Sequence, residues 1–129
     1  MTEFERVSSR AVWEAKVGYC RALRAGDLVF VTGTAPVDES GAGTFAPGDP
    51  YAQAGRCLEL IERALRSFGA DRTRIARTRL FVTDISRWAE YGRAHAEFFG
   101  EHRPTTTMVE VRRLIAPEMM IEIEADAVL

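Results

Sequence analysis

The sequence has few cysteines, no long hydrophobic run and no large excess of charge of either sign. Only 2 cysteines occur among the 129 residues, and neither Cys20 nor Cys57 belongs to a CxxC pair or a metal-ligand cluster, so we expect no disulfide framework and no metal site. The apolar runs are too short to span a membrane. The N-terminal segment MTEFERVSSR carries charges of both signs instead of the apolar centre of a signal peptide, which predicts a cytoplasmic protein.

The balance of charge argues against nucleic acid as a partner. The formal net charge is -2, whereas nucleic-acid-binding proteins usually concentrate lysine and arginine on one face. The one basic cluster, residues 71–79 (DRTRIARTR), is interrupted by Ile75 and Ala76. We interpret this cluster as a solvated sheet edge and turn, and we expect neither nucleic acid nor a membrane as a partner.

The pattern of apolar residues predicts a single domain over residues 1–129 that begins with a hairpin and a helix. Residues 18–33 (GYCRALRAGDLVFVTG) form two strand-like runs that meet at a turn. From Asp49 the period changes, because Asp49 can cap a helix and Pro50 can occupy its first position. The helix is expected to end at Gly69, and its buried stripe recurs every three or four residues: Ala54, Leu58, Ile61, Leu65 and Phe68.

The second half of the chain predicts a strand, a helix and two closing strands. These elements cover residues 75–85, 86–100, 105–114 and 119–129. The buried stripe of the helix is expected to consist of Trp88, Tyr91, His95 and Phe98. The order strand, strand, helix, strand, helix, strand, strand predicts an α+β fold, a mixed β-sheet with two helices packed on one face.

Alternation along the last two strands separates their side chains into two faces. Ile121 and Ile123 are expected to face the helices, and Glu122 the opposite side, together with Glu124 and Asp126. We group Thr106 and Met108 of the preceding strand with these acids, and Thr107, Val109 and Val111 with the helices. A solvent-exposed sheet face explains this pattern about as well as a functional site does. Met108 and Met120 among the polar residues nevertheless suggest a subunit interface.

Few residues are candidates for chemistry. Glu122 is the best carboxylate, because it follows Met119, Met120 and Ile121 and partial burial could raise its pKa. The alternative interpretation is that the side chain of Glu122 points to water, as alternating acids on a strand usually do. His95 is better explained as a packed, hydrogen-bonded histidine than as a general base, because it lies in an apolar stripe. Nucleophile-elbow and phosphate-loop motifs are absent, so we expect no covalent nucleophile and no cofactor.

Several segments carry a resemblance over nearly the whole chain. They are GYCRALRAGDLVFVTGTAP (residues 18–36), TRLFVTDISRW (78–88), AEFFGEHRP (96–104) and VEVRRL with IEIEADAVL (109–114 and 121–129). With these segments, in this order and with little insertion, the chain resembles the RidA (YjgF) family. The resemblance implies a chorismate-mutase-like domain and a trimeric assembly. The free sheet face would then be buried in the homotrimer, and clefts between subunits would hold a small-molecule substrate.

The resemblance also implies an activity and site residues. The best-known family members hydrolyse reactive imines and enamines, such as 2-iminopropanoate, to ketones and ammonia. Tyr19 matches the cleft tyrosine of the family, Thr32 and Gly33 match its Ser-Gly pair, and Glu122 matches its water-activating glutamate.

Two positions depart from the family pattern. Thr106 stands where deaminating members carry an arginine that clamps the substrate carboxylate, and a hydroxyl cannot replace a contact of about 1.5 to 3 kcal/mol. Gly92 replaces a cleft asparagine. Arg21, Arg112 or Arg113 could supply charge from another direction, or could be ordinary surface arginines.

These observations leave alternative functions. The first is an imine/enamine deaminase-type hydrolase that acts on a reactive metabolic intermediate, with a substrate range altered by Thr106. The second is a non-catalytic small-molecule-binding or regulatory trimer. Ribonuclease activity, attributed to some relatives, is disfavoured by the acidic balance and the lack of an aromatic, basic surface.

Overall fold

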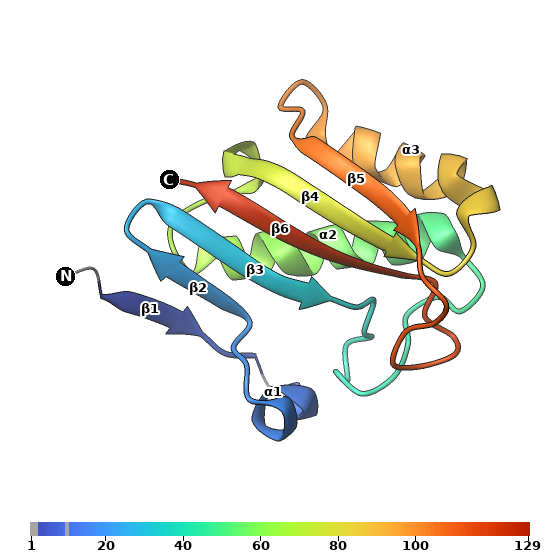
Figure 1. Cartoon of the computed structure of the whole chain (residues 1–129), viewed down its shortest axis with the longest axis horizontal. Coiled ribbons are helices and arrows are strands. Elements are labelled where there is room, and N and C mark those ends of the chain that lie inside the picture. Colours follow the sequence, from blue (N-terminus) through green and yellow to red (C-terminus); the bar gives the residue numbers. More distant parts are fainter. Residues whose placement is uncertain (1–2, 10) are drawn as a thin grey trace.

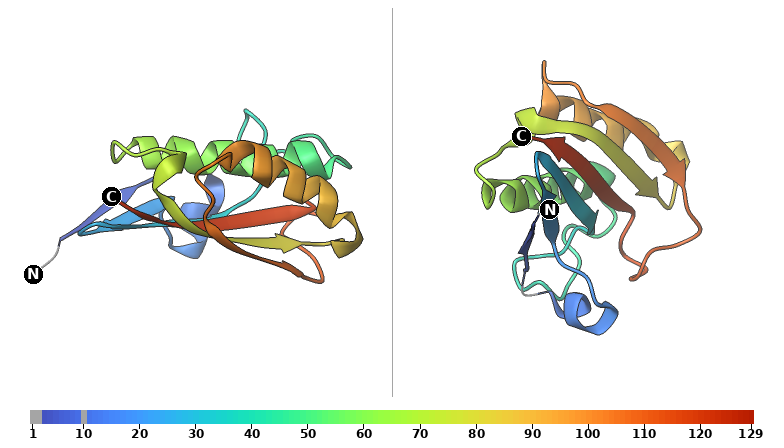
Figure 2. Two further views of the ribbon diagram at one scale, coloured as in Figure 1. Left: turned by 90° about the horizontal axis from the view of Figure 1, so that it is seen from above. Right: turned by 60° about the vertical axis from the view of Figure 1, so that its left-hand side comes forward.

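A six-stranded β-sheet with two long helices on one face forms the frame of the protein (Figures 1 and 2). The computed structural model describes residues 3–9 and 11–129. The elements are β1 (Phe4–Val7), α1 (Val12–Val17), β2 (Ala22–Ala25), β3 (Leu28–Thr34), α2 (Pro50–Arg66), β4 (Ile75–Val82), α3 (Trp88–Phe99), β5 (Thr105–Glu110) and β6 (Ile121–Val128), with short 3-10 turns η1 (Arg72–Arg74) and η2 (Ile85–Arg87). The α+β fold predicted from the sequence is confirmed.

The strands are ordered β1-β2-β3-β6-β4-β5, so the C-terminal strand lies in the middle of the sheet. All neighbours are antiparallel except β4 and β5, which are parallel. Figure 2 shows α2 and α3 on one face, with the other face left open. The prediction missed β1 and α1, which have 4 and 6 residues and are too short for a periodic signal.

Helix α2 follows its sequence signals. The carboxylate of Asp49 accepts a hydrogen bond from the N–H of Ala52 (3.0 Å), and Pro50 opens the first turn. Its apolar stripe is buried against β3 and β6. The chain leaves the helix through Gly69, which has a positive φ of 74°. Among the residues described, no helix is long and apolar enough to cross a membrane.

The stripe predicted for α3 is correct only in part. Tyr91 is fully buried, and His95 and Phe98 are half-buried. Trp88 is 62% exposed because it opens the helix directly after η2 and protrudes from it. Phe99, which the prediction left out, is buried instead.

The predicted faces of β5 are wrong. In the parallel pair β4–β5, Thr78 lies opposite Thr106 and Leu80 opposite Met108. Thr78 and Leu80 are buried under the helices, and the hydroxyl of Thr78 donates to that of Thr106 (2.7 Å). Thr106 and Met108 therefore share the helix face, while Thr107 and Val109 lie on the open face.

Gln53 of α2 joins two long loops to the core. Its Nε2 donates to the carbonyls of Glu118 (2.9 Å) and Ala46 (3.3 Å), and its Oε1 accepts from the N–H of Met120 (2.8 Å). The side chain is completely buried. One amide thus satisfies backbone groups of both loops next to the start of β6.

We expect Gln53→Met, which keeps the volume but removes these bonds, to lower the free energy of unfolding by about 2 to 4 kcal/mol, because buried backbone groups lose their partners. Urea denaturation of the variant and the wild type measures this difference. Ser67→Ala, an exposed change at the opposite end of the same helix, is the control. Equal stability of Gln53→Met and wild type would show that the loops do not depend on the amide.

Candidate functional site

Glu122 is positioned by the strand that carries it. Its neighbours Ile121 and Ile123 are fully buried beneath the helices, so alternation turns Glu122 to the other side of β6. Its carboxyl group lies against Gly33 of β3. A Cβ atom at Gly33 would stand 3.1 Å from Cδ and Oε2 of Glu122, closer than side chains normally pack. The missing side chain of Gly33 thus provides the space that the carboxyl group occupies.

Arg21 reaches the same place from the segment that connects α1 to β2. Helix α1 ends at Gly18, whose left-handed conformation (φ 86°) turns the chain into the sheet. The N–H of Arg21 then donates to the carbonyl of Val7 (2.8 Å), and its carbonyl accepts from the N–H of Thr32 (3.1 Å). Its side-chain Nη2 donates to the carbonyl of Gly33 (3.3 Å). Arg21 and Glu122 therefore flank the same glycine.

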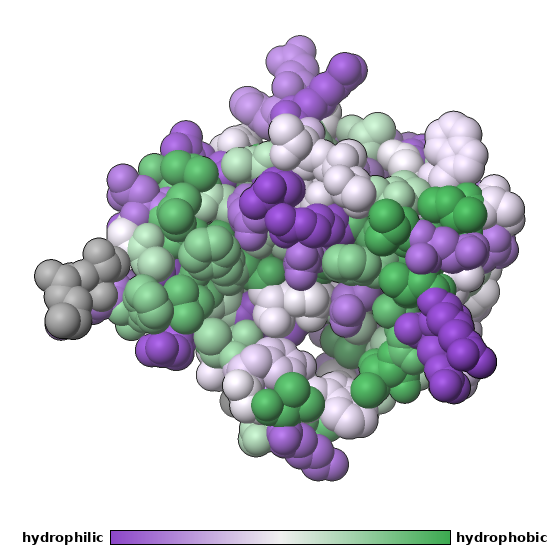
Figure 3. Space-filling view, viewed as in Figure 1, coloured by the Kyte–Doolittle hydropathy of each residue, from purple (hydrophilic) through white to green (hydrophobic). Residues whose placement is uncertain are grey.

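A cavity of about 680 Å³ brings these residues together with Tyr19. Its lining comes from α1, from the loop after β3, from α2 and from the loop before β6. Figure 3 shows that the surface is hollowed beside the part of the molecule that contains α1. Of the site residues predicted from the sequence, the cavity contains Tyr19, Arg21, Gly33 and Glu122.

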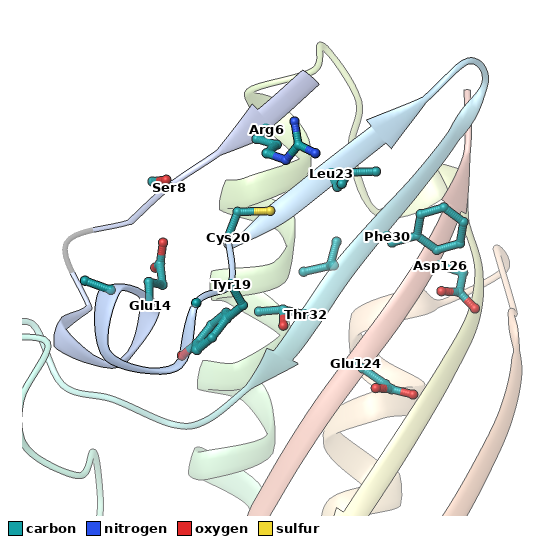
Figure 4. A pocket seen from close by; sticks show the side chains of 13 residues that line it. Arg6, Ser8, Glu14, Tyr19, Cys20, Leu23, Phe30, Thr32, Glu124 and Asp126 are labelled. Atoms are coloured by element: carbon teal, nitrogen blue, oxygen red, sulfur yellow. The ribbon is translucent and has the colours of Figure 1, made fainter. Parts of the chain in front are cut away.

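A second, more open cavity of about 790 Å³ lies on the open face of the sheet (Figure 4). Tyr19 lines both cavities and so stands between them. Thr32 lies in this second cavity, with Cys20, Phe30 and Glu124. Thr32 and Gly33 thus line different cavities, and the register of β3 against β6 shifts between Val31 and Thr34, at this pair.

The environment of Glu122 sets its ionisation. Burial raises the pKa of the Glu122 carboxyl, the charge of Arg21 opposes this rise, and the charge of Glu124 adds to it. Within the described residues, Arg21 and Glu122 approach without forming an ion pair, and Glu122 accepts no side-chain hydrogen bond. Glu122 is therefore a carboxyl group that favours its protonated form more than an exposed glutamate does.

The remaining predicted residues form a separate cluster on the other side of the sheet. Thr106 and Met108 lie on the helix face of β5, and Gly92 lies on α3. Nε2 of His95 is hydrogen-bonded to the hydroxyl of Thr78 (2.8 Å), which also contacts Thr106. Burial lowers the pKa of His95. The interpretation of His95 as a packed, hydrogen-bonded histidine is confirmed.

Sequence reasoning missed most of the apolar wall of the first cavity. Trp13 and Val17 come from α1, Ile115 and Met119 from the loop before β6, and Leu60 from α2. Only Leu60 lies in a segment with a clear period, and there it falls outside the buried stripe. Among the described residues, no cluster of histidine, cysteine and acidic side chains is placed to hold a metal ion.

Comparisons with known proteins identify the family of the chain. The family model described as Endoribonuclease L-PSP matches residues 9–129. SCO2049 of Streptomyces coelicolor is 34% identical over 122 residues, covering 95% of this chain and 90% of that protein. The 3-aminoacrylate deaminase RutC of Acinetobacter baylyi is 33% identical over 112 residues, covering 84% of this chain and 85% of that protein.

A solved structure extends the likeness to three dimensions. Rv2704 of Mycobacterium tuberculosis, described as a member of the YjgF/YER057c/UK114 family, superposes with a TM-score of 0.88 at 46% identity. The match covers 98% of this chain and 100% of that chain. Fold and sequence are thus shared over nearly the full length.

Replacement of Glu122 by glutamine is expected to change how stability depends on pH. Below about pH 4 the folded and unfolded states both hold the proton, so the carboxyl group has no effect. As the pH rises, the unfolded state releases its proton first, because folding raises the pKa of Glu122. The wild type should therefore lose stability relative to Glu122→Gln until the folded pKa is passed, and the difference should then stay constant.

Urea denaturation of both proteins from about pH 3 to about pH 8 measures this difference. A difference in the free energy of unfolding that does not change with pH reflects the amide itself. The change of this difference with pH is therefore the informative quantity. A wild type that gains stability relative to the variant as pH rises would contradict the raised pKa.

Proposed function

The chain belongs to the YjgF/RidA family, and from this membership we propose that it hydrolyses reactive imines or enamines to a carbonyl compound and ammonia. The observation that carries the proposal is the carboxyl group of Glu122, held in a cavity beside Tyr19 and Arg21 with its pKa raised by burial. A relative at 33% identity is named a 3-aminoacrylate deaminase, and 3-aminoacrylate is an enamine.

The reaction needs proton transfers at two stages. An enamine first takes a proton on carbon and becomes the iminium ion, which an imine forms by taking a proton on nitrogen. Water then adds to the C=N carbon as its proton passes to the Glu122 carboxylate, which gives a neutral carbinolamine. Its nitrogen receives that proton, ammonia leaves, and the hydroxyl proton of the resulting protonated carbonyl returns to the carboxylate. A carboxyl group with a raised pKa suits both transfers, because it accepts a proton more readily than an exposed glutamate does and can return it. Tyr19, on the wall of the same cavity, would orient the water.

The substrate range is proposed to differ from that of relatives that use an arginine clamp. Thr106 lies on the helix face of β5, where its hydroxyl is already bonded to Thr78. It presents no charged fork to a carboxylate. The substrate would be a reactive metabolic intermediate bound without that contact from β5.

A homotrimer would complete the cleft. Glu122 and Thr106 lie on opposite faces of the sheet of one chain, so a single substrate can contact both positions only if they come from different copies. The open face also carries exposed apolar side chains, including Phe30 (45%) and Val109 (43%). Burial of this face between copies would remove them from water.

A ribonuclease is less well supported than a deaminase. Three of the four arginines of the basic cluster at residues 71–79 form ion pairs within the chain: Arg72 pairs with Glu62 (2.6 Å), Arg77 with Asp126 (3.0 Å) and Arg79 with Glu124 (3.0 Å). The fourth, Arg74, donates to the carbonyl of Val128 (2.8 Å). Binding of an RNA backbone needs a groove of available cations. The non-catalytic binding trimer remains the alternative, and it predicts ligand binding without release of ammonia.

We expect Glu122→Gln to lower kcat for ammonia release by about 10²- to 10⁴-fold, because an amide cannot accept the proton from water. The assay generates imines in situ with an amino-acid oxidase and follows ammonia. Glu39→Gln is the matched control, since Glu39 lines the same cavity but its side chain is 82% exposed at the rim. Unchanged turnover in Glu122→Gln would exclude the proposed role, and no release from the wild type would favour the binding trimer.

Thr106→Arg should lower KM for 2-imino acids by about tenfold or more, because a guanidinium on β5 restores a charged contact to the carboxylate. Imines without a carboxylate should be unaffected. Thr106→Lys, which adds a charge without the planar fork, should gain less. The same assay with paired substrates measures these effects, and an equal change for both substrate types would show that β5 does not contact the carboxylate.

A further inference from the structure

Among the described residues, three arginines line the cavity that contains Glu122, and two of them are already neutralised. Nη1 of Arg56 contacts the carboxylates of Glu39 (3.1 Å) and Glu59 (3.2 Å). Arg63 pairs with the same Glu59 (3.2 Å). Neither arginine is therefore a free cation for a ligand.

Arg21 differs from these two. Its only side-chain hydrogen bond within the described residues is the one from Nη2 to the carbonyl of Gly33 (3.3 Å). Its Nε is buried, and no acceptor among the described residues reaches it. A buried N–H without a partner is costly, and it is costlier on a charged group. Nη1 has no acceptor among the described residues either, and it is not closed off from solvent as Nε is, so the guanidinium keeps a donor that a ligand can reach. A planar anion can accept two parallel bonds from such a group.

The position of Arg21 relative to Glu122 adds a second observation. The two groups influence each other electrostatically, yet they form no ion pair between them. Gly33 lies between them: its carbonyl accepts the bond from Arg21, and the carboxyl group of Glu122 fills the space above its Cα. A ligand that enters the cavity beside Gly33 can therefore contact the guanidinium with one end and the carboxyl group with the other.

One wall of the cavity is apolar. Val17 is 72% exposed and Ile115 is 66% exposed, and both line it together with Trp13. Leu60 and the buried Met119 extend this wall. The volume of about 680 Å³ lies in the range of pockets that hold drug-sized ligands, well above the need of a three-carbon imine.

We infer that Arg21 is the anion-binding residue of this cavity, and that the substrates are imines or enamines that carry both a carboxylate and a sizeable apolar substituent. This inference rests on the proposed function. It assigns the carboxylate contact to a residue at the start of β2, on the same chain as Glu122, in place of the contact that Thr106 cannot make. The apolar substituent would lie against Trp13 and Ile115.

Phenylacetate is a suitable probe, because it combines a carboxylate with an apolar ring and does not react. Isothermal titration calorimetry of the full chain compares it with phenylacetamide, which has the same shape but no charge, and with acetate, which has no ring. We expect phenylacetate to bind at least about tenfold more tightly than either. Equal affinity for phenylacetate and phenylacetamide would overturn the inference.

Variants then test the role of Arg21 in binding the anion. Arg21→Gln should weaken phenylacetate binding by about tenfold or more and change phenylacetamide binding by less than about twofold. Arg63→Gln removes the same charge from the same cavity and should change neither. Glu122→Gln should strengthen phenylacetate binding severalfold, because a negative charge next to the anion is removed. Equal losses in Arg21→Gln and Arg63→Gln would show that only the overall charge matters, against the inference.

Arg21→Lys covers the case in which Arg21→Gln does not fold, judged by circular dichroism. It keeps the charge but loses the planar guanidinium. It should therefore weaken the binding of phenylacetate by about threefold without weakening that of phenylacetamide. Binding and turnover separate the two proposals. Ammonia release that depends on Glu122, with phenylacetate binding insensitive to Arg21, would overturn only the inference. Arg21-dependent binding without any ammonia release would overturn only the proposed function.

Discussion

The central position of β6 is the constraint on which the rest of the structure depends. This strand pairs with β3 on one side and β4 on the other, and α2 packs over it. Burial of Ile121 and Ile123 contributes about 1.5 to 3 kcal/mol each and fixes which face of the strand meets the helices. Because alternate residues point in opposite directions, the same burial places Glu122 on the other face, next to Gly33. The stability of the core and the position of the carboxyl group therefore have one cause, and a shift of register by one residue would remove both.

The short N-terminal elements supply what the sheet alone lacks. β1 and α1 form a lobe beside β2, visible at the lower left of Figure 1. The N–H of Ser9 donates to the carboxylate of Glu14 (3.1 Å), which holds the start of α1 to the segment after β1. The left-handed Gly18 then sends the chain back, so that Tyr19 and Arg21 reach the cavity. A lobe with little core of its own thus provides half of the candidate site.

Local sequence signals predicted the elements that have strong periods or caps. They failed where the pairing of two strands decides which face of the sheet a residue occupies. The Asp49 cap, the Pro50 start and the apolar stripe were sufficient for α2. Alternation was sufficient to place Glu122 opposite the core. Alternation on β5 separates Thr106 and Met108 from Thr107, but it does not say which set meets the helices, and only the parallel pairing with β4 decides this. Arg21 carries no local signal that distinguishes it from a surface arginine, because its unused donor results from folding.

The three acids of β6 look equivalent in the sequence, and their cation partners make them different. Glu124 pairs with Arg79 (3.0 Å) and Asp126 with Arg77 (3.0 Å), both supplied by the neighbouring strand β4. The residue of β4 opposite Glu122 is Phe81, which offers no charge. Among the described residues, the cation that influences Glu122 is Arg21, which lies on the far side and makes no direct contact. A partly buried carboxyl group without an ion pair holds a proton more readily than an exposed one, whereas Glu124 and Asp126 are ion-paired with arginine. The distribution of arginine on β4 thus distinguishes Glu122 from the other two acids of the strand.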